Sequence, residues 1–225
     1  MSEVMVMREL EAIIFDMDGV LLDSTKHIWV SYNQLLSKYG VKTEGDEIKR
    51  YMGRSTRDQL GMIREDYGIE EEIDSEEFSR RAGEIELDLV EDKLDLDENI
   101  WDLIESAKGK EIKIAVATSS NLERAEKILD LLGVRDELDL LFTADDLERH
   151  KPHPDIYLKT AEELGVEPED CVVFEDAVNG IKSAQRADMK VVAIETDYQS
   201  REDIERADLV ISDFSEVDLG ILEGL

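Results

Sequence analysis

Short runs of consecutive apolar residues recur along this 225-residue chain and constrain its fold more than any other feature. Most show no alternation of polar and apolar side chains, which is typical of strands buried on both faces of a parallel sheet. Residues with helical spacing separate the later runs, and Gly133 and Gly165 follow two of these helical stretches as stop signals. Strand–helix alternation from residue 111 onward therefore predicts a doubly wound α/β domain. The apolar runs are residues 11–15, 112–117, 140–143, 171–174, 191–194 and 209–211.

Residues 25–95 follow a different pattern, because they contain no convincing buried strand. Two amphipathic helical faces are apparent there, one with Ile28, Tyr32, Leu35, Leu36 and Tyr39, the other with Phe78, Ala82, Ile85 and Leu89. We therefore expect an α-helical insert, residues 25–95, that interrupts an α/β core formed by residues 1–24 and 96–225. The acidic run at residues 70–77 is predicted to be a solvated loop and helix start, not a metal site.

The charge of the chain excludes several kinds of partner. Lys and Arg total 26 and Asp and Glu total 57, which gives a formal net charge of −31. Nucleic acids and anionic membranes bind mainly through Lys and Arg, so we expect neither as a partner. The chain has no apolar run of the roughly 18 residues that a membrane span needs. Met1–Glu11 shows no secretory apolar region, and the single cysteine, Cys171, is expected in the core, so a reducing, cytoplasmic location is favoured.

The segment with most chemical information directly follows the first apolar run. Asp16 and Asp18 lie two residues apart, and Gly19 permits a sharp turn after them. Ligands of open α/β sheets bind at the carboxyl ends of strands, so both carboxylates are expected at a ligand site. A calcium loop is excluded, because Val20 and His27 stand where that motif needs an acid and a terminal Glu.

Four segments together resemble the signatures of the haloacid dehalogenase-like hydrolase superfamily. In chain order they are Phe15–Ser24, Val116–Asn121, Lys151–Asp155 and Phe174–Ile181. The helical insert resembles the subgroup of β-phosphoglucomutases and small sugar-phosphate or phosphoglycolate phosphatases. The resemblance implies a Rossmann-like core with an α-helical cap, and Mg²⁺-dependent hydrolysis of a small phosphate monoester. Relatives usually carry Gly where this chain has Asp188, so Asp188 is expected to adopt a left-handed backbone conformation.

The resemblance also implies roles for individual residues. Asp16 would be the nucleophile that forms an aspartyl-phosphate. Asp18 would be the general acid for the leaving alkoxide and then the general base for the attacking water. Thr118 and the backbone N–H of Ser119 would bind the phosphoryl group, and Lys151 would neutralise the nucleophile and that group.

A metal site follows from the same resemblance. Asp16, Asp176 and the backbone carbonyl of Asp18 match the family's Mg²⁺ ligands, and Glu175 would reach the metal directly or through water. Helix capping is an alternative reading of two of these segments. Glu175 and Asp176 could cap the helix that follows them, and Asn121 with the serines before it is typical of a helix N-cap.

Several reactions occur in this superfamily, so the fold does not select one. Dehalogenases lack the second Asp, and its presence here as Asp18 favours phosphoryl transfer. In an ungapped comparison, the cap Arg of β-phosphoglucomutase falls on Thr56 and its cap His on Ile28, which favours a phosphatase over a mutase. Arg54 is the expected cap residue for substrate binding. A non-catalytic scaffold is disfavoured, because Asp16 and Asp18 are both present.

The negative charge exceeds what such a site requires. A strongly negative exterior slows the encounter with an anionic substrate, whereas molar salt shortens the screening length to roughly 3 Å. Acids outnumber bases by more than two to one, and we therefore hypothesise a halophilic or salt-adapted cytoplasmic enzyme. A phosphate monoester is the expected partner, and a monomer is compatible with the sequence.

Overall fold

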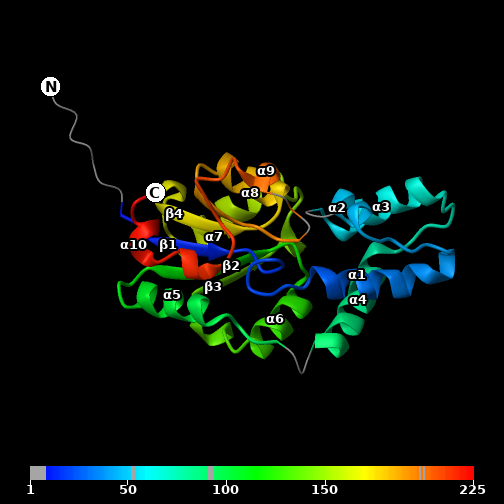
Figure 1. The fold of residues 1–225 in the computed structure, drawn as a ribbon, viewed down its shortest axis with the longest axis horizontal. Coiled ribbons are helices and arrows are strands. Elements are labelled where there is room, and N and C mark those ends of the chain that lie inside the picture. The colour runs from blue at the N-terminus through cyan, green and yellow to red at the C-terminus, as the bar shows by residue number, and fades with distance from the viewer. Residues whose placement is uncertain (1–8, 52–53, 91–93, 198, 200) are drawn as a thin grey trace.

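A parallel sheet of six strands forms the centre of the larger part of the molecule (Figure 1). The computed structural model describes residues 9–51, 54–90, 94–197, 199 and 201–225. The strands lie in the order β3-β2-β1-β4-β5-β6, which confirms the predicted doubly wound parallel sheet. Their bounds are β1 Ala12–Phe15, β2 Lys113–Thr118, β3 Leu140–Thr143, β4 Cys171–Glu175, β5 Lys190–Ile194 and β6 Leu209–Ile211.

Helices cover both faces of this sheet, which explains why its strands are apolar without alternation. Ile13 and Phe15 of β1 pack into one core cluster, whereas Ala12 and Ile14 pack into another. The cluster around Phe15 includes α5 (Glu98–Lys108), α6 (Leu122–Leu131) and α10 (Leu219–Leu222). The cluster around Ile14 includes α7 (Asp155–Leu164), α8 (Val178–Arg186) and α9 (Arg201–Ile204). Cys171 is buried in this second cluster, as predicted.

Two strands extend one residue further than predicted. β2 continues through Thr118, which pairs with Thr143 on β3, and β4 continues through Glu175, which pairs with Ala193 on β5. Polar residues are tolerated there because the carboxyl ends of the strands face a ligand site rather than the core. Asp188, which follows α8, has a φ of 60°, so its predicted left-handed conformation is confirmed.

Among the described residues between β1 and α5, four α-helices form a cap on the side toward which β1 points (Figure 1). They are α1 (Thr25–Leu36), α2 (Asp46–Tyr51), α3 (Thr56–Tyr67) and α4 (Ser75–Val90). Trp29, Leu36, Tyr51 and Ile63 belong to a separate apolar core within the cap. Helix α1 is shorter than its apolar face suggested. It gives way to a 3₁₀ turn, Ser37–Tyr39, before Gly40 takes a φ of 74°.

The acidic segment of the cap is a loop and helix start, as predicted. Asp74 accepts hydrogen bonds from the backbone N–H groups of Glu76 at 2.9 Å and Glu77 at 3.1 Å, and it thereby caps α4. The domain boundary proposed at residue 95 closely follows residues 91–93, which lie outside the described residues. Most of the segment Met1–Glu11, expected to lack a secretory signal, is also outside them.

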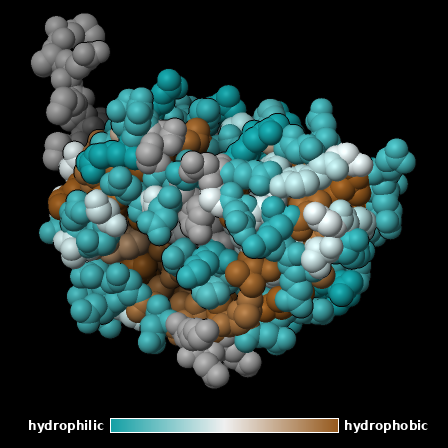
Figure 2. All heavy atoms as spheres, turned by 45° about the vertical axis from the view of Figure 1, so that its right-hand side comes forward, coloured by the Kyte–Doolittle hydropathy of each residue, from teal (hydrophilic) through white to brown (hydrophobic). Residues whose placement is uncertain are grey.

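Hydrophilic side chains cover most of the molecular face shown in Figure 2, with smaller apolar areas between them. Within the described parts of the chain, no helix combines the length and the apolar character that crossing a membrane requires. Asp97 and Asn121 cap α5 and α6 with their side chains, which fixes where these two core helices begin.

Candidate active site

The carboxyl ends of three adjacent strands bring the predicted site residues together. Asp16 follows β1, Thr118 ends β2, and Glu175 ends β4 beside Asp176, while Lys151 comes from the loop before α7. The cap closes the other side of a cavity of about 160 Å³. Every predicted site residue lines this cavity: Asp16, Asp18, Arg54, Thr118, Ser119, Lys151, Glu175 and Asp176.

Asp16 and Lys151 form a buried ion pair. Lys151 Nζ lies 2.5 Å from Asp16 Oδ1, and the two side chains are 7% and 11% exposed. Burial raises the pKa of Asp16 to about 7, although the charge of Lys151 opposes the rise. The pKa of Lys151 is raised well above its usual value, because the carboxylates of Asp16 and Glu175 outweigh the effect of burial. Lys151 therefore stays charged, and a further positive charge would be needed to keep Asp16 fully ionised as a nucleophile.

Three buried carboxylates gather around this lysine. Asp16, Glu175 and Asp176 offer oxygens that all lie within 4.8 Å of one another. Burial, together with the charges of Glu175 and Asp16, raises the pKa of Asp176 well above its usual value. One lysine does not balance three acids, and a hard divalent cation would do so in an all-oxygen donor set. The cluster thus fits Mg²⁺ by its charge and its chemistry.

Both carboxylate oxygens of Glu175 already accept hydrogen bonds. One accepts from Lys151 Nζ at 2.7 Å and from the Tyr157 hydroxyl at 2.8 Å, and the other from the backbone N–H groups of Asp176 at 3.0 Å and Ala177 at 3.1 Å. Glu175 thereby orients Lys151 toward Asp16, and direct metal coordination by Glu175 would displace one of these donors. Tyr157 was not identified from the sequence, where it is one apolar-face position of α7 among several.

Two glycines permit this close approach of carboxylates. Gly19 has a φ of 87°, and a Cβ there would lie 2.2 Å from Asp176 Oδ2. A Cβ at Gly180, on α8, would lie 1.6 Å from Glu175 Oε1. A side chain at either position would therefore displace an acid of the cluster.

The predicted phosphate site lies where β2 leads into α6. Thr118 is buried, and its hydroxyl oxygen accepts a hydrogen bond from the backbone N–H of Ser120 at 3.1 Å. Asn121 is the N-cap of α6 and accepts from the backbone N–H of Arg124 at 2.9 Å. The capping interpretation therefore holds for Asn121. Thr118 and Ser119 line the cavity beside the N-terminal end of α6, an environment that favours an anion.

The carboxylate of Asp18 accepts four hydrogen bonds. The two terminal nitrogens of Arg124 donate to its two oxygens at 2.7 and 2.8 Å, Ser120 donates at 3.0 Å, and Ser24 donates as well. Burial raises the pKa of Asp18, but the charge of Arg124 and these hydrogen bonds lower it further, so that it lies below its usual value. Asp18 is accordingly ionised in this arrangement.

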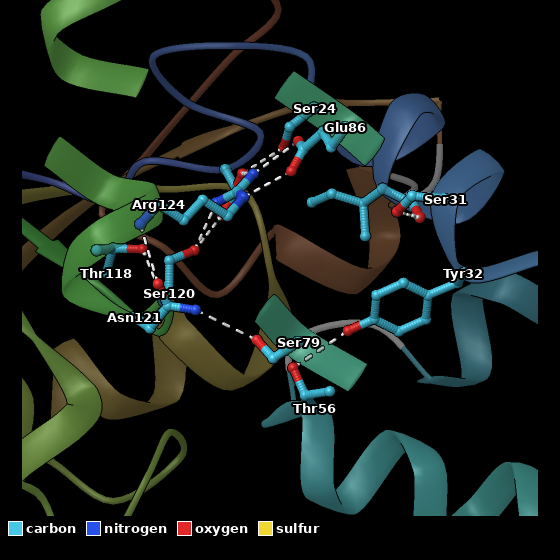
Figure 3. A network of polar contacts seen from close by, with 12 residues as sticks. Ser24, Ser31, Tyr32, Thr56, Ser79, Glu86, Thr118, Ser120, Asn121 and Arg124 are labelled. Atoms are coloured by element: carbon cyan, nitrogen blue, oxygen red, sulfur yellow. Dashed lines mark hydrogen bonds and ion pairs between the residues drawn. The ribbon is translucent and has the colours of Figure 1, made fainter. Parts of the chain in front are cut away.

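Arg124 also reaches the cap, as Figure 3 shows. Its Nε donates to Glu86 Oε2 at 2.6 Å, and a terminal nitrogen donates to Glu86 Oε1 at 2.7 Å. Neither residue was identified from the sequence, although both carried a signal. Glu86 stands four residues after Ala82 and Arg124 four before Ile128, so each is a charged residue on a predicted apolar face.

The cap contributes its own residues to the cavity. Arg54 is exposed and lines it, whereas Arg57 lines a separate groove on the cap. The Tyr32 hydroxyl and Thr56 Oγ1 lie 3.1 Å apart (Figure 3). Trp29 belongs to the cap core and also lines the cavity.

Comparison with known proteins is consistent with this geometry. A family model of haloacid dehalogenase-like hydrolases matches residues 13–194. The chain is 34% identical to a phosphorylated carbohydrates phosphatase of Thermotoga maritima, over 79% of this chain and 82% of that protein. It is 30% identical to the β-phosphoglucomutase of Bacillus subtilis, over 95% and 94% of the two chains. A crystal structure of β-phosphoglucomutase from Clostridium difficile superposes with a TM-score of 0.84 at 27% identity, covering 96% of each chain. The chain therefore belongs to the haloacid dehalogenase-like hydrolases, among relatives that include sugar-phosphate phosphatases and mutases.

Proposed function

We propose that this chain is a Mg²⁺-dependent phosphatase that hydrolyses a small phosphorylated metabolite, such as a sugar phosphate, through an aspartyl-phosphate. The observation that carries the proposal is the buried Asp16–Lys151 ion pair within a cluster of acids at the ends of β1 and β4. The similarity to a phosphatase of phosphorylated carbohydrates supports the substrate class.

In the first half-reaction, a carboxylate oxygen of Asp16 attacks phosphorus, and the bond from phosphorus to the substrate oxygen breaks. Lys151 offsets the charge of the nucleophile and of the phosphoryl oxygens. Thr118 and Ser119 bind the phosphoryl group at the end of α6. Asp18, once protonated, gives its proton to the leaving alkoxide.

In the second half-reaction, Asp18 accepts a proton from water as the water attacks phosphorus. The bond between phosphorus and Asp16 breaks, and inorganic phosphate is released. Mg²⁺ would be held by Asp16, Asp176 and the backbone carbonyl of Asp18, with Glu175 nearby. When bound, the ion supplies positive charge that stabilises phosphoryl oxygens and ionised carboxylates.

Phosphate release from a panel of phosphorylated sugars and small acids tests this proposal. We expect release that requires Mg²⁺ and falls at least about a thousandfold in Asp16→Asn, because the nucleophile is lost. A protein that releases no phosphate from any of these compounds with Mg²⁺ present would contradict the proposal, as would an Asp16→Asn variant that keeps the original rate.

A β-phosphoglucomutase-type reaction is the second candidate, favoured by the similarity over nearly the whole chain to the B. subtilis mutase. A mutase returns the phosphoryl group to a second hydroxyl of the sugar and excludes water from the aspartyl-phosphate. Thr56 and Ile28 stand where resemblance to the mutases leads us to expect Arg and His, and we therefore prefer hydrolysis. Incubation with β-glucose 1-phosphate separates the two, since a mutase yields glucose 6-phosphate and a phosphatase yields free phosphate.

We also propose that the enzyme is cytoplasmic and adapted to high salt. The net charge of −31 would repel an anionic substrate and weaken the compact state in dilute buffer. Thermal melts from low salt to molar KCl test the idea. We expect the melting temperature to rise with salt, and a melting temperature that stays constant or falls would count against the adaptation.

A further inference from the structure

The guanidinium group of Arg124 connects the cap to Asp18, the proposed general acid of the core. Figure 3 shows its bonds to Glu86 of the cap. Arg124 donates two hydrogen bonds to Asp18 and two to Glu86, so that one of its terminal nitrogens serves both acids. The Arg124 side chain is 8% exposed and that of Glu86 is 1% exposed. Charge-assisted, bidentate bonds of this kind are strong and hold a defined geometry.

These three residues come from both parts of the molecule. Glu86 lies on α4 of the cap, whereas Asp18 follows β1 and Arg124 lies on α6 of the core. Gly83 is one turn before Glu86, and a Cβ at that position would contact Arg124 Cδ at 3.6 Å. The absence of a side chain at Gly83 therefore leaves room for the arginine against α4. The bond network forms only where α4 lies against α6.

The network determines how Asp18 is held. Without Arg124, the Asp18 carboxylate would keep only the bonds from Ser24 and Ser120, one to each oxygen. Without Glu86, the Nε of Arg124 would lose its acceptor, and the guanidinium would be held only by its bonds to Asp18 and Ser120. A general acid transfers its proton efficiently only when it is held within a fraction of an ångström of the productive position.

We propose that Glu86 of the cap, acting through Arg124, holds the Asp18 carboxylate in the position from which, once protonated, it transfers its proton to the leaving group. Contact between cap and core then prepares the general acid as well as enclosing the substrate. Both are positioning residues, since they act through Asp18. The inference rests on the phosphoryl-transfer function proposed above.

Two substrates of similar size distinguish positioning from other roles. Ethyl phosphate releases an alkoxide that needs a proton, whereas acetyl phosphate releases acetate, which does not. Neither carries sugar hydroxyls that Glu86 or Arg124 could bind. The ratio kcat/KM is the relevant quantity, because it covers the steps up to departure of the leaving group. We expect Glu86→Gln and Arg124→Lys to lower kcat/KM for ethyl phosphate about tenfold to a hundredfold, and that for acetyl phosphate less than about threefold.

A double variant keeps the test informative if the single variants fail to fold. Glu86→Met with Arg124→Met removes both members of the buried pair at similar volume, a change that is often tolerated. It should show the same selective loss on ethyl phosphate. Arg80→Lys is the matched control, because Arg80 lies on the same cap helix but is exposed and paired with Glu77 and Glu84. This control should leave both substrates unaffected.

Equal losses on the two substrates would show that the network only stabilises the fold, and would overturn the inference. A wild-type protein that hydrolyses acetyl phosphate but no alkyl phosphate would have no working general acid to position, and would also overturn it. Failure of the proposed function can be distinguished from failure of this inference. If the proposed function is wrong, the wild-type protein releases phosphate from neither substrate.

Discussion

The core side and the cap side of the cavity are built by different means. On the core side, Phe15 pairs with Val116 on one neighbouring strand and with Phe174 on the other, so the residues just beyond these positions converge. On the cap side, α1, α3 and α4 pack around their own apolar core and reach the site through Arg54, Thr56 and Glu86. The sheet therefore fixes the reacting groups rigidly. The cap can change a residue such as Arg54 without disturbing Asp16 or Lys151, whereas Asp18 is connected to the cap through Arg124 and Glu86.

The largest effect is expected when the core loses its buried cation. Lys151→Met would leave Asp16 and Glu175 buried without their shared partner. Since Lys151 lowers the pKa of Asp16, its loss raises that pKa and leaves less of the nucleophile ionised near neutral pH. We expect phosphate release to fall about a thousandfold or more. Stability should fall by about 3 kcal/mol in the absence of metal, as urea unfolding would show.

The matched control for this change is Lys159→Met, which removes an exposed lysine from α7. It should leave activity unchanged and alter stability by about 0.5 kcal/mol or less. Comparable rates for Lys151→Met and Lys159→Met would mean that the buried ion pair has no part in catalysis.

Glycines in the two regions should respond to the same substitution with opposite sign. At Gly180, in the core, the new Cβ would lie 1.6 Å from Glu175 Oε1, so Gly180→Ala should displace that carboxylate. At Gly61, inside α3 of the cap, a Cβ has nothing within 4 Å. We expect Gly180→Ala to cost about 2 kcal/mol or more and most of the activity. Gly61→Ala should stabilise by about 0.5–1 kcal/mol through helix propensity.

Urea unfolding measured on both variants, alongside phosphate release, checks this pair. A Gly180→Ala protein with unchanged stability and activity would show that α8 shifts easily away from β4. The core side would then be less rigid than the close contact between Gly180 and Glu175 indicates.

The same contrast explains which site residues could be predicted from the sequence. Residues at strand ends were predictable, because an apolar run followed by Asp16 or by Asp176 marks both a strand and the edge where ligands bind. Sheet register then brings such residues together without any information on side-chain packing. The helical nature of the cap and the loop before α4 followed from periodicity and turn chemistry.

Residues that act across the domain boundary were not predictable in this way. Glu86 and Arg124 are neighbours only because α4 lies against α6, and helical periodicity carries no information on how two helices meet. The only local indication of their role was a charged residue on an apolar helix face. Charged residues at the exposed edge of such a face give the same sequence pattern. Tyr157 could be predicted even less well. The sequence pattern of an aromatic residue on the buried face of α7 is the same whether or not its hydroxyl binds Glu175.

A moderate effect is expected on metal affinity, and it should be confined to the core. Asp176→Asn removes one acid from the cluster with Asp16 and Glu175. The Mg²⁺ concentration for half-maximal activity should rise about tenfold. Added Mg²⁺ should raise the melting temperature of the wild-type protein, because ligands that bind only the folded state stabilise it, and this rise should shrink in the variant. An Mg²⁺ response unchanged in Asp176→Asn would place the metal elsewhere.

The smallest effect is expected at the cap, where Arg54 lines the cavity and takes no part in the chemistry that we propose. Arg54→Gln should raise KM for the preferred sugar phosphate about tenfold, because the substrate loses one hydrogen bond from a charged group. The variant should change kcat little. Arg57→Gln is the natural control, since Arg57 lies three residues further along but lines a different groove. Steady-state kinetics on both variants would show whether selectivity resides in the cap. If Arg54→Gln lowers kcat and leaves KM unchanged, Arg54 contributes to the reaction itself. The proposal that this cap residue only selects the substrate would then be wrong.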